Sequence, residues 1–145
     1  MLQQAQATVM QRGAVATANP DGAKAAAEVL EAGGNAIDAA VAAAFAMGVV
    51  EPLDNGIGAS GFALVHSVEE DRTLAIDFLG TAPRAAHFEL MPAYRGFMTG
   101  YHLLVRDQAN EIGHRSVAVP GAVRGLAHLL ARLGGMPLWE VLEPR

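Results

Sequence analysis

The stretch that most constrains how this chain can fold is Ala36–Val50, AIDAAVAAAFAMGVV, which is apolar on nearly every side. Asn35 can cap a helix here, and Asp38 in the first turn is favoured by the positive end of the helix. Pro52 ends the run. A surface helix shows one polar face, and this helix shows none. We therefore expect other layers of structure to enclose it.

The rest of the pattern predicts an α+β chain. It predicts, in order, a strand at 13–18, a helix at 23–32, a hairpin with strands at 62–67 and 73–79, a helix from about 119–122 to 133 and the start of a helix at 136–142. Gly33 and Gly34 stop the first helix, because glycine accepts the left-handed conformation that closes helices. Residues 80–116 show no regular pattern.

Composition excludes several classes of function. The net charge of −5 argues against nucleic acid as a partner, because binding to phosphates needs clustered Lys and Arg. The nearest basic cluster, Arg124 with Arg132, is interpreted as the solvated side of a helix. The sequence contains no Cys, which excludes disulfides, thiolate metal sites and a Cys nucleophile.

Neither a membrane anchor nor an export signal is expected. The longest apolar run, 39–50, is shorter than the ~20 residues that a membrane span needs. Residues 1–10 have no basic region and no continuous apolar region, so they do not predict a signal peptide. We therefore expect a cytoplasmic protein without a membrane partner.

The stretch 56–61, GIGASG, has the G-x-G-x-x-G spacing of a dinucleotide-binding loop. That motif follows a strand and opens a helix, so that the helix N-terminus faces the pyrophosphate. Here a helix precedes the loop and a strand follows it. The nucleophile elbow G-x-S-x-G also fails, because Phe62 occupies its last position. The loop is better interpreted as a tight turn before the hairpin, with nucleotide binding as an alternative.

Few other residues are candidates for chemistry. Asp77 alternates with the apolar residues of its strand, so we expect it to face solvent. Thr99 lies inside the chain, without the adjacent base or freed amino terminus that a Thr nucleophile needs. No metal site is predicted, because the histidines show neither an i, i+4 pair nor a carboxylate-rich motif. They are His66, His87, His102, His114 and His128.

Several segments become recognisable when they are taken together. They are EAGGNAIDAAVAAAFAMGVVEP, GIGASGFALV, AIDFLGTAPRAA, VAVPGAVRGL and GGMPLWEVLEP. In order and spacing they resemble the N-terminal part of the large subunit of the γ-glutamyltranspeptidase family. The resemblance covers residues 13–145 and leaves 1–12 as an N-terminal extension.

The resemblance implies an N-terminal nucleophile hydrolase with a four-layer αββα sandwich, of which this chain would hold an incomplete N-terminal portion. In that family a precursor cuts itself into a large and a small subunit. The new N-terminal Thr of the small subunit attacks a γ-glutamyl amide, usually glutathione, and the acyl group passes to water, an amino acid or a peptide. The family implies no metal or organic cofactor.

The chain departs from the family pattern at two points. It matches only the beginning of the large subunit, and Thr99 does not lie at the place of the nucleophile, so we expect the chain alone to have no catalytic residue and no activity. Leu79 occupies the position of an Arg that binds the α-carboxylate of the donor in the family. An aliphatic side chain cannot donate bidentate hydrogen bonds, so an amidase or acylase that uses another acyl group fits Leu79 better. Arg84 is interpreted as a surface residue.

Two functions remain open. In the first, the chain is a truncated family member, and its complete relative is an amide hydrolase or acyltransferase acting on γ-glutamyl or other acyl amides. In the alternative, the chain is a non-catalytic subunit or interaction module that pairs with a separately encoded remainder, or with itself, and so covers the apolar helix.

Overall fold

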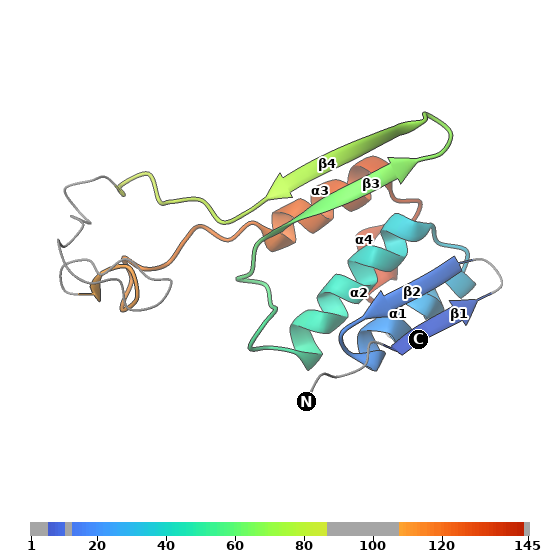
Figure 1. Ribbon diagram of the computed structural model, residues 1–145, viewed down its shortest axis with the longest axis horizontal. Helices are drawn as coiled ribbons and strands as arrows, with labels where there is room; N and C mark the ends of the chain where they lie inside the picture. The colour runs from blue at the N-terminus through green and yellow to red at the C-terminus, as the bar shows by residue number, and fades with distance from the viewer. Residues whose placement is uncertain (1–5, 11–12, 87–107, 144–145) are drawn as a thin grey trace. The chain divides into compact units, whose positions relative to one another are not determined.

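The computed structural model of the chain describes residues 6–10, 13–86 and 108–143 (Figure 1). They fall into two compact units. The first unit consists of the described residues up to Leu79 and from Gly121 onward, and the second consists of those between Gly80 and Pro120.

The first unit combines strands with helices. Its elements are β1 (Gln6–Met10), β2 (Gly13–Thr17), α1 (Pro20–Glu31), α2 (Ala36–Val50), β3 (Gly61–Ser67), β4 (Arg72–Phe78), α3 (Ala122–Leu133) and α4 (Leu138–Leu142). The predicted α+β class is confirmed, as are the central helix α2, the β3–β4 hairpin and α3. Among these elements, none of the helices has both the length and the apolar character needed to cross a membrane.

The start of α1 and the strand β1 differ from the prediction. Helix α1 begins at Pro20, because the side chain of Asn19 accepts the N–H of Asp21 at 3.0 Å and proline fits a first helical turn. The sequence pattern does not predict β1. It pairs antiparallel with β2, with Gln6 opposite Thr17, and strand pairing of this kind depends on its neighbours.

The end of α1 confirms the predicted glycine stop. Gly33 has a φ of +97°, in the left-handed region that favours glycine. The N–H of Gly34 donates to the carbonyl of Val29 at 3.0 Å, and the N–H of Gly33 donates to Leu30 at 3.1 Å. These two bonds form a Schellman motif, which turns the chain directly into the cap of α2.

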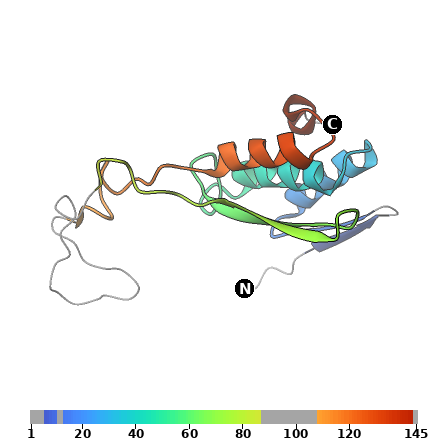
Figure 2. The ribbon, with the colours of Figure 1, turned by 90° about the horizontal axis from the view of Figure 1, so that it is seen from above.

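One layer of helices covers one face of the strands. In Figure 2, α2 and α3 lie on one side and the β3–β4 hairpin lies on the other. The hairpin alternates in burial: Ala63 and Val65 are half-buried against the core, whereas Phe62 and Leu64 are each 68% exposed on the other face. Among the described residues, no element covers that outer face.

Helix α2 is the centre of the core, and it packs against α1, α3 and α4. The buried core residues are Ala26, Val29, Ala39, Val41, Ala42, Ala43, Leu129, Leu130 and Val141. Four of these nine residues are alanines, whose small side chains let the helices approach closely. The predicted enclosure of α2 is therefore confirmed for most of its length, but Val49 near its end is 78% exposed.

The second unit is irregular in the residues described, as the sequence pattern predicts for 80–116. Thr81 and Val119 form an antiparallel bridge, with backbone hydrogen bonds of 3.2 and 2.8 Å.

Candidate functional site

Asp38 is fully buried, and its carboxylate joins two distant parts of the first unit. Its oxygens accept the backbone N–H groups of Asn35 at 2.8 Å, Gly135 at 2.9 Å and Met136 at 3.1 Å. The bond from Asn35 is half of a capping box at the start of α2. The other bonds hold the turn between α3 and α4, so Asp38 has a structural role at this junction.

The turn at 134–135 has little room for side chains. A Cβ at position 134 would lie 2.6 Å from Oδ1 of Asp38. The side-chain amide of Asn35 also donates to the carbonyl of Leu133 at 2.9 Å. The two glycines of GGMPLWEVLEP thus let the backbone reach the buried carboxylate.

The Gly-rich loop connects α2 to β3, which confirms the predicted order of helix, loop and strand. Gly56 has a φ of +153°. A Cβ added at Gly48 of α2 would lie 3.3 Å from the Cα of Gly56, so the loop passes close to α2. The carbonyl of Ala59 accepts the N–H of Ala122 at 3.0 Å, which ties the loop to the start of α3. The loop therefore makes a tight turn and packs closely against the backbone of α2 and the start of α3, as the sequence predicts.

Leu79 directly follows β4 and is 54% exposed. Its N–H donates to the carboxylate of Asp77 at 2.9 Å. Asp77 is exposed on the outer face of the hairpin, opposite Phe62 in the register, and this confirms its predicted orientation. Arg84, in the second unit, is exposed, which agrees with a surface role.

The remaining sequence candidates show no shared site. His66, His114 and His128 are exposed, and Nδ1 of His66 lies 3.2 Å from Oγ1 of Thr73. Within 13–86 and 108–143, the structure shows no group of three or more His, Asp or Glu side chains that could hold a metal ion. Thr99, His87 and His102 lie outside the described residues.

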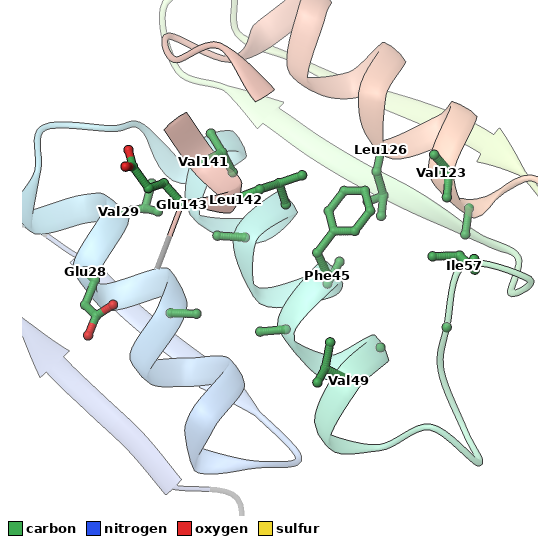
Figure 3. A pocket seen from close by; sticks show the side chains of 17 residues that line it. Glu28, Val29, Phe45, Val49, Ile57, Val123, Leu126, Val141, Leu142 and Glu143 are labelled. Atoms are coloured by element: carbon green, nitrogen blue, oxygen red, sulfur yellow. The ribbon is translucent and has the colours of Figure 1, made fainter. Parts of the chain in front are cut away.

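The first unit contains hollows that the sequence reasoning missed. A groove of about 390 Å³ lies among the helices and the Gly-rich loop, and its lining is mostly apolar (Figure 3). A second hollow of about 720 Å³ lies between β2 and the small residues of α1 and α2. In the sequence, the one indication of these hollows is that α2 lacks a polar face.

Comparison with known proteins decides the family. The sequence matches the profile of the family described as Gamma-glutamyltranspeptidase over residues 22–145. The chain belongs to the gamma-glutamyltranspeptidase family. Acylase ACY 1 proenzyme of Pseudomonas sp. (strain SE83) is 44% identical over 92% of this chain, and Glutathione hydrolase proenzyme of Pseudomonas aeruginosa is 36% identical over 95%. Helicobacter pylori gamma-glutamyltranspeptidase has a TM-score of 0.76 at 32% identity over 93% of this chain.

Membership of the gamma-glutamyltranspeptidase family explains why the described elements form only one layer of helices and one layer of strands. The chain spans only 24% and 23% of the two curated relatives and 36% of the solved Helicobacter pylori chain. The described helices and strands are thus an incomplete, N-terminal portion of the αββα sandwich of the N-terminal nucleophile hydrolases. Proteins named hydrolase and acylase are both among the relatives, so the family context is that of amide hydrolysis and acyl transfer.

Proposed function

We propose that this chain is one part of an amide hydrolase or acyltransferase that works only together with the remainder of the sandwich. The remainder would supply the N-terminal Thr nucleophile, and the chain alone would be inactive. The observation that carries the proposal is the outer face of the β3–β4 hairpin. Phe62 and Leu64 are each 68% exposed there, although a strand layer with apolar residues on both faces needs cover on both.

The hollow beside β2 supports the same proposal. The described strands form two separate two-stranded sheets, and β2 pairs only with β1. The hollow of about 720 Å³ is lined by β2 and by small residues of α2 such as Ala36, Ala40 and Ala43. A strand from the remainder could pair with the free edge of β2 and pack against these alanines.

Leu79 supports a substrate other than a γ-glutamyl amide. We propose that the complete enzyme accepts an acyl group without an α-carboxylate, because Leu79 offers no hydrogen-bond donor from its side chain. The identity of 44% to a relative named acylase, against 36% to one named glutathione hydrolase, is in line with this substrate class.

The experiment joins this chain to the part of the Pseudomonas SE83 acylase that follows its matched stretch. Two substrates are compared, γ-glutamyl-p-nitroanilide and hexanoyl-p-nitroanilide, for the chain alone and for the complex. We expect no turnover by the chain alone, and turnover of the hexanoyl amide by the complex. Leu79→Arg in the complex should raise the preference for the γ-glutamyl amide, and an unchanged preference would contradict the role of Leu79.

Two results would overturn the catalytic proposal. Turnover by the purified chain alone that disappears in Thr99→Ala would place the nucleophile inside the chain. A stable complex that cleaves neither substrate would favour the alternative, a non-catalytic subunit or interaction module, which the same exposed faces also fit.

A further inference from the structure

We infer that Asn55, in the Gly-rich loop that connects α2 to β3 (Figure 1), is a site of spontaneous deamidation, and that its isoaspartyl product moves the loop away from α2. In this reaction the backbone nitrogen of the next residue bonds to the side-chain carbonyl carbon. The side-chain amide leaves as ammonia and takes the proton of that nitrogen. Water then opens the succinimide to aspartate or isoaspartate. The inference does not depend on the proposed function, because the loop supplies both reacting groups and solvent supplies the water.

The residue after Asn55 leaves the attacking nitrogen open. Gly56 has no Cβ to obstruct the approach, and its φ of +153° is a conformation that other residues rarely adopt. The N–H groups of Asp54 and Asn55 both donate to the carbonyl of Glu51, at 3.1 and 2.9 Å, and hold the turn up to residue 55. No described residue accepts the N–H of Gly56, so its nitrogen can attack without breaking a hydrogen bond of the fold.

The side chain of Asn55 is equally accessible. It is exposed to solvent, and it makes no hydrogen bond to the part of the chain that the structure describes. Its amide is therefore free to turn toward the nitrogen of Gly56, and water can reach the succinimide once it forms.

The other asparagines of the sequence lack this combination. Asn19 precedes a proline, whose nitrogen has no proton to lose. Asn35 caps α2, and its side-chain amide donates to the carbonyl of Leu133 at 2.9 Å. Asn110 precedes a glutamate, and its side-chain oxygen is buried. An exposed side chain and a following glycine therefore occur together only at Asn55.

Isoaspartate would disturb the loop where the loop packs closely. Its main chain runs through the former side-chain carbon, so the path from residue 55 to residue 56 becomes longer. A Cβ added at Gly48 would lie 3.3 Å from the Cα of Gly56, so there is little room between the loop and α2. The carbonyl of Gly56 accepts the N–H of Ala59 at 3.0 Å, and the carbonyl of Ala59 accepts that of Ala122 at 3.0 Å. The longer path therefore loosens the loop from α2 and from the start of α3.

The first test incubates the purified chain in mildly alkaline buffer, digests it at acidic pH and follows each asparagine by mass spectrometry. Conversion raises the mass of a peptide by the difference between water and ammonia, and electron-transfer fragmentation distinguishes isoaspartate from aspartate. We expect Asn55 to convert to both products. Asn35 should convert about tenfold or more slowly, because its cap must open first.

Two results of this test would overturn the assigned site. A synthetic peptide of residues 51–61 gives the rate without the fold. If the peptide converts while Asn55 in the chain keeps its amide, the fold protects the site and the inference is wrong. Equal rates at Asn35 and Asn55 in the chain would show that the exposed loop does not select the site.

Urea denaturation before and after incubation tests the effect on the loop. We expect a fraction of the incubated chain, equal to its isoaspartate content, to unfold at lower urea concentration. Asn55→Ser cannot deamidate and should keep its initial midpoint. Fresh Asn55→Asp carries the charge of the product on a normal backbone, and at this exposed position it should unfold like the fresh parent chain. An incubated chain that holds isoaspartate at residue 55 and unfolds in a single unchanged transition would contradict the displacement of the loop, as would an equal loss in fresh Asn55→Asp.

Discussion

Both carboxylate oxygens of Asp38 accept the backbone N–H of Gly135, at 2.9 and 3.1 Å, across 97 positions of the sequence. Asp38 also accepts the N–H of Asn35 in the capping box of α2. The buried side chain of Asp38 therefore caps the start of α2 and also holds the turn between α3 and α4, and α4 packs against α2.

Replacing Asp38 by Ala should lower the free energy of unfolding by about 3 kcal/mol, because buried backbone N–H groups lose their acceptor. Asp38→Asn keeps one acceptor oxygen and should cost less. Urea denaturation of the chain, followed by circular dichroism, measures both. Asp54→Ala, at an exposed position, is the control and should change stability by less than ~0.5 kcal/mol. Equal losses at the two positions would contradict the role assigned to Asp38.

Gly125→Ala should destabilise the contact between α3 and β4 by about 1–3 kcal/mol, the usual range for overpacking. A Cβ at position 125 would lie 2.2 Å from Cγ of Phe78. Gly58→Ala is the matched control, because a Cβ there meets nothing within 4 Å. The double variant with Phe78→Leu should lose less stability than the sum of the two single changes. Strict additivity in thermal unfolding would show that residues 125 and 78 are not in contact.

Asn35→Ala should cost about 1–2 kcal/mol, because α2 loses its cap. Its side-chain oxygen accepts the N–H groups of Ile37 and Asp38 at 2.8 and 3.0 Å. Asn35→Ser keeps a capping oxygen and removes the donor to Leu133 without adding a charge beside the buried Asp38, so it should recover most of the stability. Chemical denaturation distinguishes the two, and a larger loss in Asn35→Ser than in Asn35→Ala would refute the assignment of the cap.

The exposed hairpin face should make the isolated chain self-associate. Phe62→Lys with Leu64→Lys should raise its monomer fraction in sedimentation velocity and prevent assembly with the remainder, because both outcomes depend on the same apolar face. Val68→Lys, at an 84% exposed position in the turn of the hairpin, is the control. A variant with lysines at 62 and 64 that still assembles would show that the outer face of the hairpin is not the interface.

Much of the local structure was predictable. Gly33 predicts the end of α1 and Asn35 predicts the start of α2, because capping depends on neighbours within a few residues. The alternation in β3 and β4 places Asp77 on the outer face, because side chains alternate along a strand. The family was also recognisable from segments in a fixed order, and the profile match over 22–145 confirms it.

The sequence by itself therefore determined the central helices and the hairpin, the caps and the family. The tertiary structure alone decided that Asp38 binds Gly135, that Gly125 makes room for Phe78, that β1 pairs with β2, and that α2 keeps an open groove. Caps and alternation follow from covalent neighbours. Contacts across the fold depend on which surfaces meet when the chain packs, and no local pattern of residues records that.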